Sequence, residues 1–211
     1  MELNELLEAS GHFDEQLVSM LDDGGFALSE GPPRIRTCAG AILLSLEHAR
    51  MVRVAFGKAS PNSGTALLRL QYEALLKGAW VLHAANELQV AKLASSLTPE
   101  AEQAAKNLPG AAEMLSALLA KAPPGLTAPL QEFQGSSLKA RNSFGHGGIH
   151  PLSRLADGFP QALAGQVVKM SNGLLHMSYR MLASLSGSNS LMATITHAYR
   201  DHQACLPIID R

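Results

Sequence analysis

Cysteine is scarce in this chain of 211 residues, which contains only Cys38 and Cys205. The two lie far apart, and neither has another cysteine at a CxxC spacing. This excludes a small fold held together by disulfides and gives no sign of a zinc knuckle. We expect two reduced, partly buried thiols in a reducing compartment.

Segments that would direct the chain to a membrane are also lacking. The first eight residues are acidic and amphipathic, without the basic and apolar regions of a signal peptide. The most apolar window, residues 74–85, is interrupted by Lys77 and His83 and is too short to span a bilayer. We therefore expect a cytoplasmic protein with no membrane role.

Aromatic residues make up only 5% of the chain, whereas hydrophobic residues reach 46% and Ala and Leu are abundant. This balance favours helices, because Ala and Leu lose little conformational entropy in a helix. There is no alternating strand pattern, internal repeat or low-complexity tract. We expect an all-α protein whose residues 1–211 form a single compact helical bundle. Residues 1–33 form an acidic N-terminal helix or arm, and residues 34–211 form the body.

The charges are unevenly distributed along the chain, although the net charge is only −1. Residues 1–33 hold eight acidic residues and no Lys or Arg, so residues 34–211 hold ten acidic residues and all 17 basic ones. A basic face on the body would suit a nucleic acid. The simpler interpretation of the first segment is a solvated acidic helix.

Helical periodicity and glycine or proline breaks predict the elements. We expect helices at 3–21, 34–57, 65–85, 99–107, 110–121, from about 125 to Gly147, 160–185 and 191–204. Candidate core residues of the second helix are Ile42, Leu43, Leu46, Ala49, Val52 and Val54. The 160–185 helix is rich in Met and Leu, which indicates core or a dimer interface. Short connections predict antiparallel neighbours.

A candidate site lies near the end of the helix that precedes Gly147. There, Arg141 is followed directly by Asn142 and, five residues on, by His146. In a continuous helix Arg141 and His146 would lie about 140° apart around the axis, whereas Asn142 and His146 would share a face. Glycines at 145, 147 and 148 make a helix end before His146 plausible.

This Arg-Asn-x3-His segment resembles the signature of the HEPN superfamily, which includes toxin, phage-defence and CRISPR-associated ribonucleases. Residues 68–80 and 142–150 also resemble segments of an uncharacterised bacterial family of similar length. The HEPN resemblance implies a metal-independent endoribonuclease or RNA-binding protein that needs no cofactor. It also implies a homodimer in which the motifs of both chains meet, and an antitoxin-like partner protein in a toxin–antitoxin setting.

The residue types suit RNA chemistry. A histidine can accept the proton of a ribose 2′-hydroxyl or protonate the leaving oxygen. An arginine can bind the phosphate and stabilise its charge in the transition state. We therefore predict Arg141, His146 and Asn142 as catalytic residues. The other interpretation has Asn142 and His146 bonded to backbone carbonyls and Arg141 in a surface ion pair.

Supporting residues are predicted on the 65–85 helix and after the motif. Arg69, Glu73 and Lys77 are spaced four apart, as in a row of surface salt bridges of small energetic value. Functionally, Glu73 would orient Arg141 or His146 across the bundle. His150 is the remaining supporting residue.

Two other classes of function stay open. His146 and His150, with His48 and His83 from other helices, could hold a metal in a DinB-like bundle, although Gly147 and Gly148 argue against a continuous His-x3-His helix. Alternatively, the chain is a non-catalytic interaction module whose acidic N-terminal arm binds a basic partner.

Overall fold

The computed structural model describes residues 1–24, 31–145 and 148–208, with the backbone alone for residues 136–143 and 145. This part of the chain contains ten α-helices, a short 3-10 helix and no strand. The helices are α1 (Leu3–Asp23), α2 (Pro33–Gly57), α3 (Pro61–His83), α4 (Glu87–Ala94), α5 (Pro99–Ala105), α6 (Ala111–Lys121), α7 (Pro124–Gly145), α8 (Ile149–Asp157), α9 (Gln161–Leu185) and α10 (Asn189–Asp201), followed by η1 (Gln203–Cys205). The predicted all-α fold is confirmed.

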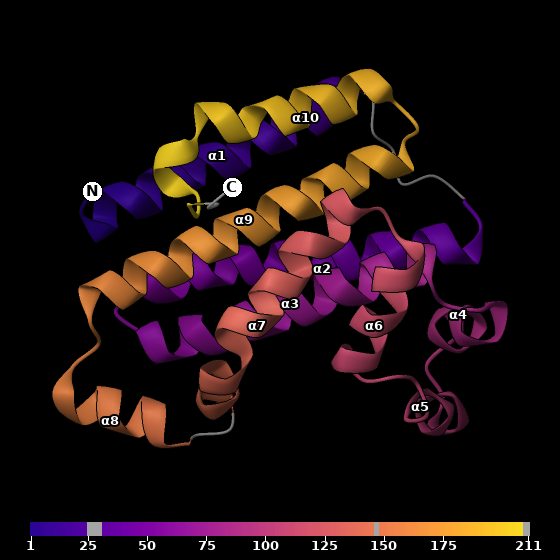
Figure 1. The fold of residues 1–211 in the computed structure, drawn as a ribbon, viewed down its shortest axis with the longest axis horizontal. Helices are drawn as coiled ribbons and strands as arrows, with labels where there is room; N and C mark the ends of the chain where they lie inside the picture. The colour runs from indigo at the N-terminus through magenta and orange to yellow at the C-terminus, as the bar shows by residue number, and fades with distance from the viewer. Residues whose placement is uncertain (25–30, 146–147, 209–211) are drawn as a thin grey trace.

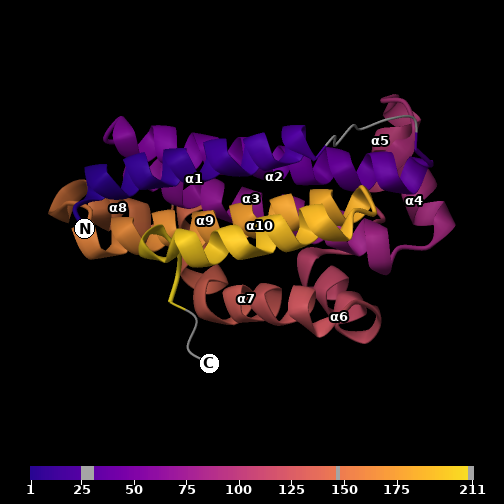
Figure 2. The ribbon, with the colours of Figure 1, turned by 90° about the horizontal axis from the view of Figure 1, so that it is seen from above.

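Three long helices, α2, α3 and α9, form the centre of the bundle, and α2 and α3 are antiparallel neighbours. Helices α1 and α10 pack on α9, and α6 and α7 pack on α3 (Figures 1 and 2). The short helices α4 and α5 lie at one end of the bundle, and α8 lies at the other (Figure 1). The acidic α1 is thus packed against the body along its length (Figure 2).

The helix starts follow from local sequence. Thr98, Asn86 and Ser188 each accept a hydrogen bond from a backbone N–H in the first turn of the following helix. Proline occupies the first turn of α2, α3 and α5, where its missing N–H costs nothing. Gly78 allows α2 and α3 to approach closely, because a Cβ there would lie 2.6 Å from Ile42 Cδ1.

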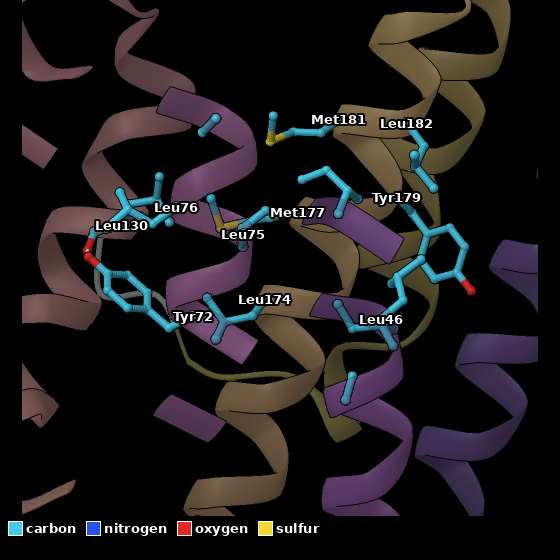
Figure 3. Close-up of a cluster of buried hydrophobic side chains, with 14 of the residues drawn as sticks. Leu46, Tyr72, Leu75, Leu76, Leu130, Leu174, Met177, Tyr179, Met181 and Leu182 are labelled. Atoms are coloured by element: carbon cyan, nitrogen blue, oxygen red, sulfur yellow. The ribbon is translucent and has the colours of Figure 1, made fainter. Parts of the chain in front are cut away.

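The hydrophobic core runs continuously through the helices (Figure 3). Tyr72 on α3 is fully buried, stacks on Phe133 of α7 at 4.7 Å between ring centroids, and donates to the Leu130 carbonyl at 3.2 Å. Trp80 is also core. The Met- and Leu-rich stripe of α9 is largely buried within the monomer (Leu174, Leu175, Met177, Met181 and Leu182), so most of it is core.

Polar side chains also join α3 to α9 inside the bundle. Gln71 Nε2 donates to the Ser171 carbonyl at 2.8 Å, and Ser171 Oγ donates back to Gln71 Oε1 at 2.7 Å. Ser45 of α2 donates to the Gln71 carbonyl at 3.0 Å. All three side chains are buried and hydrogen-bonded, which offsets the cost of removing them from water.

Several sequence predictions were wrong in detail. The predicted core residues Leu43 and Val54 are 43% and 49% exposed, because α2 carries apolar residues on more than one face. Helix α3 begins at Pro61 rather than Thr65, since a proline suits a first turn. Helices α4 and α8 were not predicted.

Candidate functional site

Two of the three predicted catalytic residues, Arg141 and Asn142, lie near the C-terminal end of α7. Arg141 and Asn142 belong to α7 by their backbone, but their side chains, and the whole of His146, lie outside the described residues. The ring of Phe144, which lies between Asn142 and His146 in the sequence, is described. The surroundings of the motif are therefore known through Phe144 and the elements around it.

Phe144 connects the motif segment to the end of the bundle. Its ring lies 6.0 Å from the ring of His150 on α8 and 6.3 Å from that of Phe159, centroid to centroid. Phe159, which precedes α9, in turn makes an edge contact with Phe56 near the end of α2. Helices α2, α7, α8 and α9 therefore meet beside the motif.

The surface next to this contact carries basic side chains. His150 is exposed on α8, and Arg154 follows it one turn later. Lys58, just past the end of α2, is exposed two residues after Phe56. The exposed Asp157 at the end of α8 adds a negative charge to the same surface, so its described charges are mixed.

Of the row predicted on α3 (Arg69, Glu73 and Lys77), the Arg69–Glu73 pair is confirmed. Arg69 Nε donates to Glu73 Oε1 at 2.7 Å, and both side chains are partly exposed. Such an i, i+4 pair contributes about 0.3–0.5 kcal/mol. Glu73 thus has Arg69 as a partner on its own helix. A contact of Glu73 with Arg141 or His146 would involve side chains outside the described residues and stays a prediction.

The metal interpretation involves four histidines, of which three are described. Burial lowers the pKa of His83, and it lowers the pKa of His48 although the charge of Glu47 opposes the shift. Among the described side chains, no group of three or more His, Cys, Asp or Glu residues is close enough to hold a metal ion. His146 lies outside that search.

Sequence reasoning missed a buried charge cluster between α1, α2 and α9. Asp14 accepts hydrogen bonds from Tyr179 Oη at 2.6 Å, from Arg50 Nε at 3.1 Å and from Arg53 Nη2. Burial raises the pKa of Asp14, but the Tyr179 hydrogen bond and the Arg53 and Arg50 charges outweigh it and leave the pKa below its ordinary value. The spacing of Asp14 from Ser10, one helical turn, places both residues on the buried side of α1. That spacing was the sequence signal that Asp14 could be buried.

A second feature that the sequence did not reveal is a cavity of about 660 Å³ between α7, α9 and α10. Phe133, Leu174 and Met177 contribute apolar walls, and Arg180 and Arg200 contribute positive charge. The cavity shows only when the three helices are assembled, because the lining residues are spread from 129 to 208.

The two cysteines are free and buried, as predicted. Burial raises the pKa of Cys38 to about 12 and also raises the pKa of Cys205. Neither thiol is therefore activated as a nucleophile. In the part of the chain that the structure describes, no helix combines the length and apolar composition needed to cross a membrane.

Comparison with known proteins gives one family and no named relative. No curated protein matches the chain, and no solved structure matches it. One family model matches residues 42–208, from the middle of α2 to the residues after η1. That span includes the α7 motif, the Arg69–Glu73 pair and the cavity. The chain therefore belongs to DUF6988, a family of unknown function.

Proposed function

We propose that this protein is a metal-independent RNA-cleaving bundle of the HEPN type, with Arg141 and His146 as its catalytic residues and Asn142 beside them. The observation that carries the proposal is the contact of Phe144, inside the motif, with His150 and Phe159. A motif next to an exposed end of the bundle suits a polymeric substrate better than one in the core. The all-α fold is a further support.

The proposed reaction is transesterification within RNA. His146 accepts the proton of the 2′-hydroxyl, whose oxygen attacks the adjacent phosphorus. The bond from phosphorus to the 5′-oxygen breaks, which leaves a 2′,3′-cyclic phosphate on one product. The departing 5′-oxygen takes a proton from water and becomes a hydroxyl, and protonated His146 returns its proton to the hydroxide that is left. Arg141 stabilises the charge on the phosphoryl oxygens, so this chemistry needs no metal.

We further propose that the active form is a homodimer joined through α8. Ile149, Leu152 and Leu155 on this helix are 77%, 62% and 75% exposed. Three neighbouring apolar side chains on one short exposed helix are typical of an interface. Helix α8 begins three residues after His146, so a two-fold contact there would bring two motifs together, each copy presenting the same patch.

The test uses the purified full chain and an end-labelled single-stranded RNA, with a DNA of the same sequence as the control. We expect cleavage of the RNA in the presence of EDTA, a cyclic phosphate on the products, and intact DNA, since DNA lacks the 2′-hydroxyl. Cleavage that requires a divalent metal, or equal cleavage of DNA, would contradict the mechanism. RNA binding without any cleavage would show that the protein binds RNA and that Arg141 and His146 are not catalytic.

A further inference from the structure

We propose that the cavity between α7, α9 and α10 binds a small amphipathic molecule that carries one carboxylate. The site is separate from the α7 motif, because its α7 residues, from Pro129 to Phe133, lie in the first half of that helix. The inference therefore does not depend on the proposed ribonuclease activity.

The size and walls of the cavity suit a ligand with an apolar body. Its volume of about 660 Å³ lies within the range of small-molecule pockets, about 300–1,000 Å³. Four of its lining side chains are large and apolar: Phe133, Met170, Leu174 and Met177. Methionine side chains are flexible and polarisable, so they can adapt to an alkyl chain.

The charges select an anionic head group. Arg180 Nε is buried and has no hydrogen-bond partner in the described part of the chain. Neither Arg180 nor Arg200 forms an ion pair with a described carboxylate. A guanidinium binds a carboxylate with two parallel hydrogen bonds. A bound carboxylate would thus supply the ion pair that Arg180 lacks among the described residues.

Two other side chains in the wall limit the ligand to a single negative charge. Glu132 also lines the cavity. The two positive charges of Arg180 and Arg200 and the negative charge of Glu132 leave a net charge of plus one in the wall, which disfavours a doubly charged phosphate. His176 adds no charge at neutral pH, because burial lowers its pKa to about 4. Its Nε2 lies 2.8 Å from the Ile195 carbonyl. One carboxylate balances this set of charges.

The experiment compares decanoate with decanol, which has the same chain and no charge. Affinities are measured by calorimetry at neutral pH on the full-length protein. The site is followed through the methyl NMR signals of Met170 and Met177, with the exposed Met51 of α2 as internal reference. We expect decanoate to shift the signals of Met170 and Met177 but not that of Met51, and to bind at least about tenfold more tightly than decanol.

The variants separate the charge from the cavity. Arg180→Gln should weaken decanoate binding by about tenfold to a hundredfold and leave decanol binding unchanged, because it removes a charge-assisted hydrogen bond. Arg154→Gln on α8 is the matched control and should change neither affinity. If Arg180→Gln does not fold, Arg200→Gln, at an exposed position, tests the same preference and should reduce the advantage of decanoate over decanol.

Three results would overturn the proposal: equal affinity of wild type for both ligands, decanoate binding that leaves the Met170 and Met177 signals in place, or no binding of either ligand. Unchanged decanoate affinity in Arg180→Gln would show that this arginine does not hold the carboxylate.

Discussion

Tyr179 on α9 donates its phenolic hydrogen to Asp14 on α1, with 2.6 Å between the two oxygens, although the residues are 165 positions apart in the chain. The same carboxylate binds Arg53 and Arg50 of α2. One buried acid therefore connects three helices. Its partners hold it in the charged form in a place from which charge is normally excluded.

Substitutions at this cluster should destabilise the fold in a graded way. Tyr179→Phe removes the hydrogen bond that the hydroxyl donates to Asp14 and the longer one, 3.3 Å, that it accepts from Arg50 Nη2. It should lower the free energy of unfolding by about 1.5–3 kcal/mol. Asp14→Ala leaves Arg53 largely buried without its carboxylate and should cost about 3–5 kcal/mol. Urea unfolding followed by circular dichroism measures both. Glu15→Gln, the exposed neighbour on α1, should change stability by less than about 0.5 kcal/mol.

His176 should make stability depend on pH in a defined window. Burial lowers its pKa to about 4, helped by the Arg180 charge and opposed by the hydrogen bond to Ile195, whereas an unfolded histidine has a pKa of about 6.5. The unfolded chain therefore binds a proton first as the pH falls, and the contribution of His176, present above pH 6.5, is lost between about 6.5 and 4. The full loss is about 3 kcal/mol.

Urea midpoints measured from pH 7 to pH 4 check this prediction. The glutamine of His176→Gln can still donate to the Ile195 carbonyl but cannot take up a proton. The free energy of unfolding of this variant should therefore fall less steeply than that of wild type between pH 6.5 and 4. An unchanged slope in this variant would contradict the prediction. Asp14 adds its own loss only at lower pH, because its folded pKa is below the ordinary value.

Substitutions in the α7 motif should separate catalysis from folding. His146→Ala should reduce RNA cleavage by about 10²–10⁴, the usual cost of losing a general acid or base. Arg141→Ala should reduce it by about 10²–10³, the cost of losing a donor to the transition state. Asn142→Ala should weaken cleavage without abolishing it. Initial rates on labelled RNA measure all three.

Matched controls for the motif are exposed residues of the same types elsewhere. His12→Ala on α1 and Arg36→Ala on α2 should leave the cleavage rate unchanged. All variants should keep the wild-type melting temperature. If His146→Ala unfolds the protein while wild type cleaves no RNA, the histidine is structural and the catalytic proposal fails.

The α8 patch should control the oligomeric state. Replacing Leu152 and Leu155 with Glu puts two negative charges on each copy of the proposed interface and should shift a dimer to a monomer in sedimentation velocity at micromolar concentration. Leu44→Glu, at a 46% exposed position on α2, is the control and should leave the dimer intact. A monomeric wild type would contradict the homodimer.

The thiols should be inert in the folded protein. Because burial raises the pKa of Cys38 to about 12 and that of Cys205 above its ordinary value, almost no thiolate forms at neutral pH. Ellman's reagent should therefore react with neither cysteine in buffer and with both in guanidinium chloride. Rapid reaction of one thiol in buffer would show that its helix opens locally.

The long helices could be predicted because each buries a stripe that repeats along its own sequence. Helix α8 was not predicted because Pro151 and the flanking glycines are typical of a loop. A proline is nevertheless tolerated in the first turn of a helix. Helix α4 had a usable signal in the capping pair of Asn86 and Gln89. Leu43 was misplaced because periodicity cannot choose among the apolar faces of α2.

The candidate site could be recognised only as a local motif, and its catalytic role stays a prediction. Nothing near Asp14 in the sequence reveals that its partners are Arg50, Arg53 and Tyr179, since these contacts form only when three helices meet. The Arg69–Glu73 pair was found because both residues lie on one helix. Contacts within an element follow from spacing, whereas contacts between elements require the tertiary structure.

The reciprocal bonds between Gln71 and Ser171 also fix the register of the bundle. Sliding α3 along α9 by one helical turn, about 5.4 Å, would separate the two side chains. It would also leave the Gln71 amide without a partner in a dry interior. Because apolar surfaces alone tolerate such a slide, the buried amide is what selects one alignment of the two helices along their common axis.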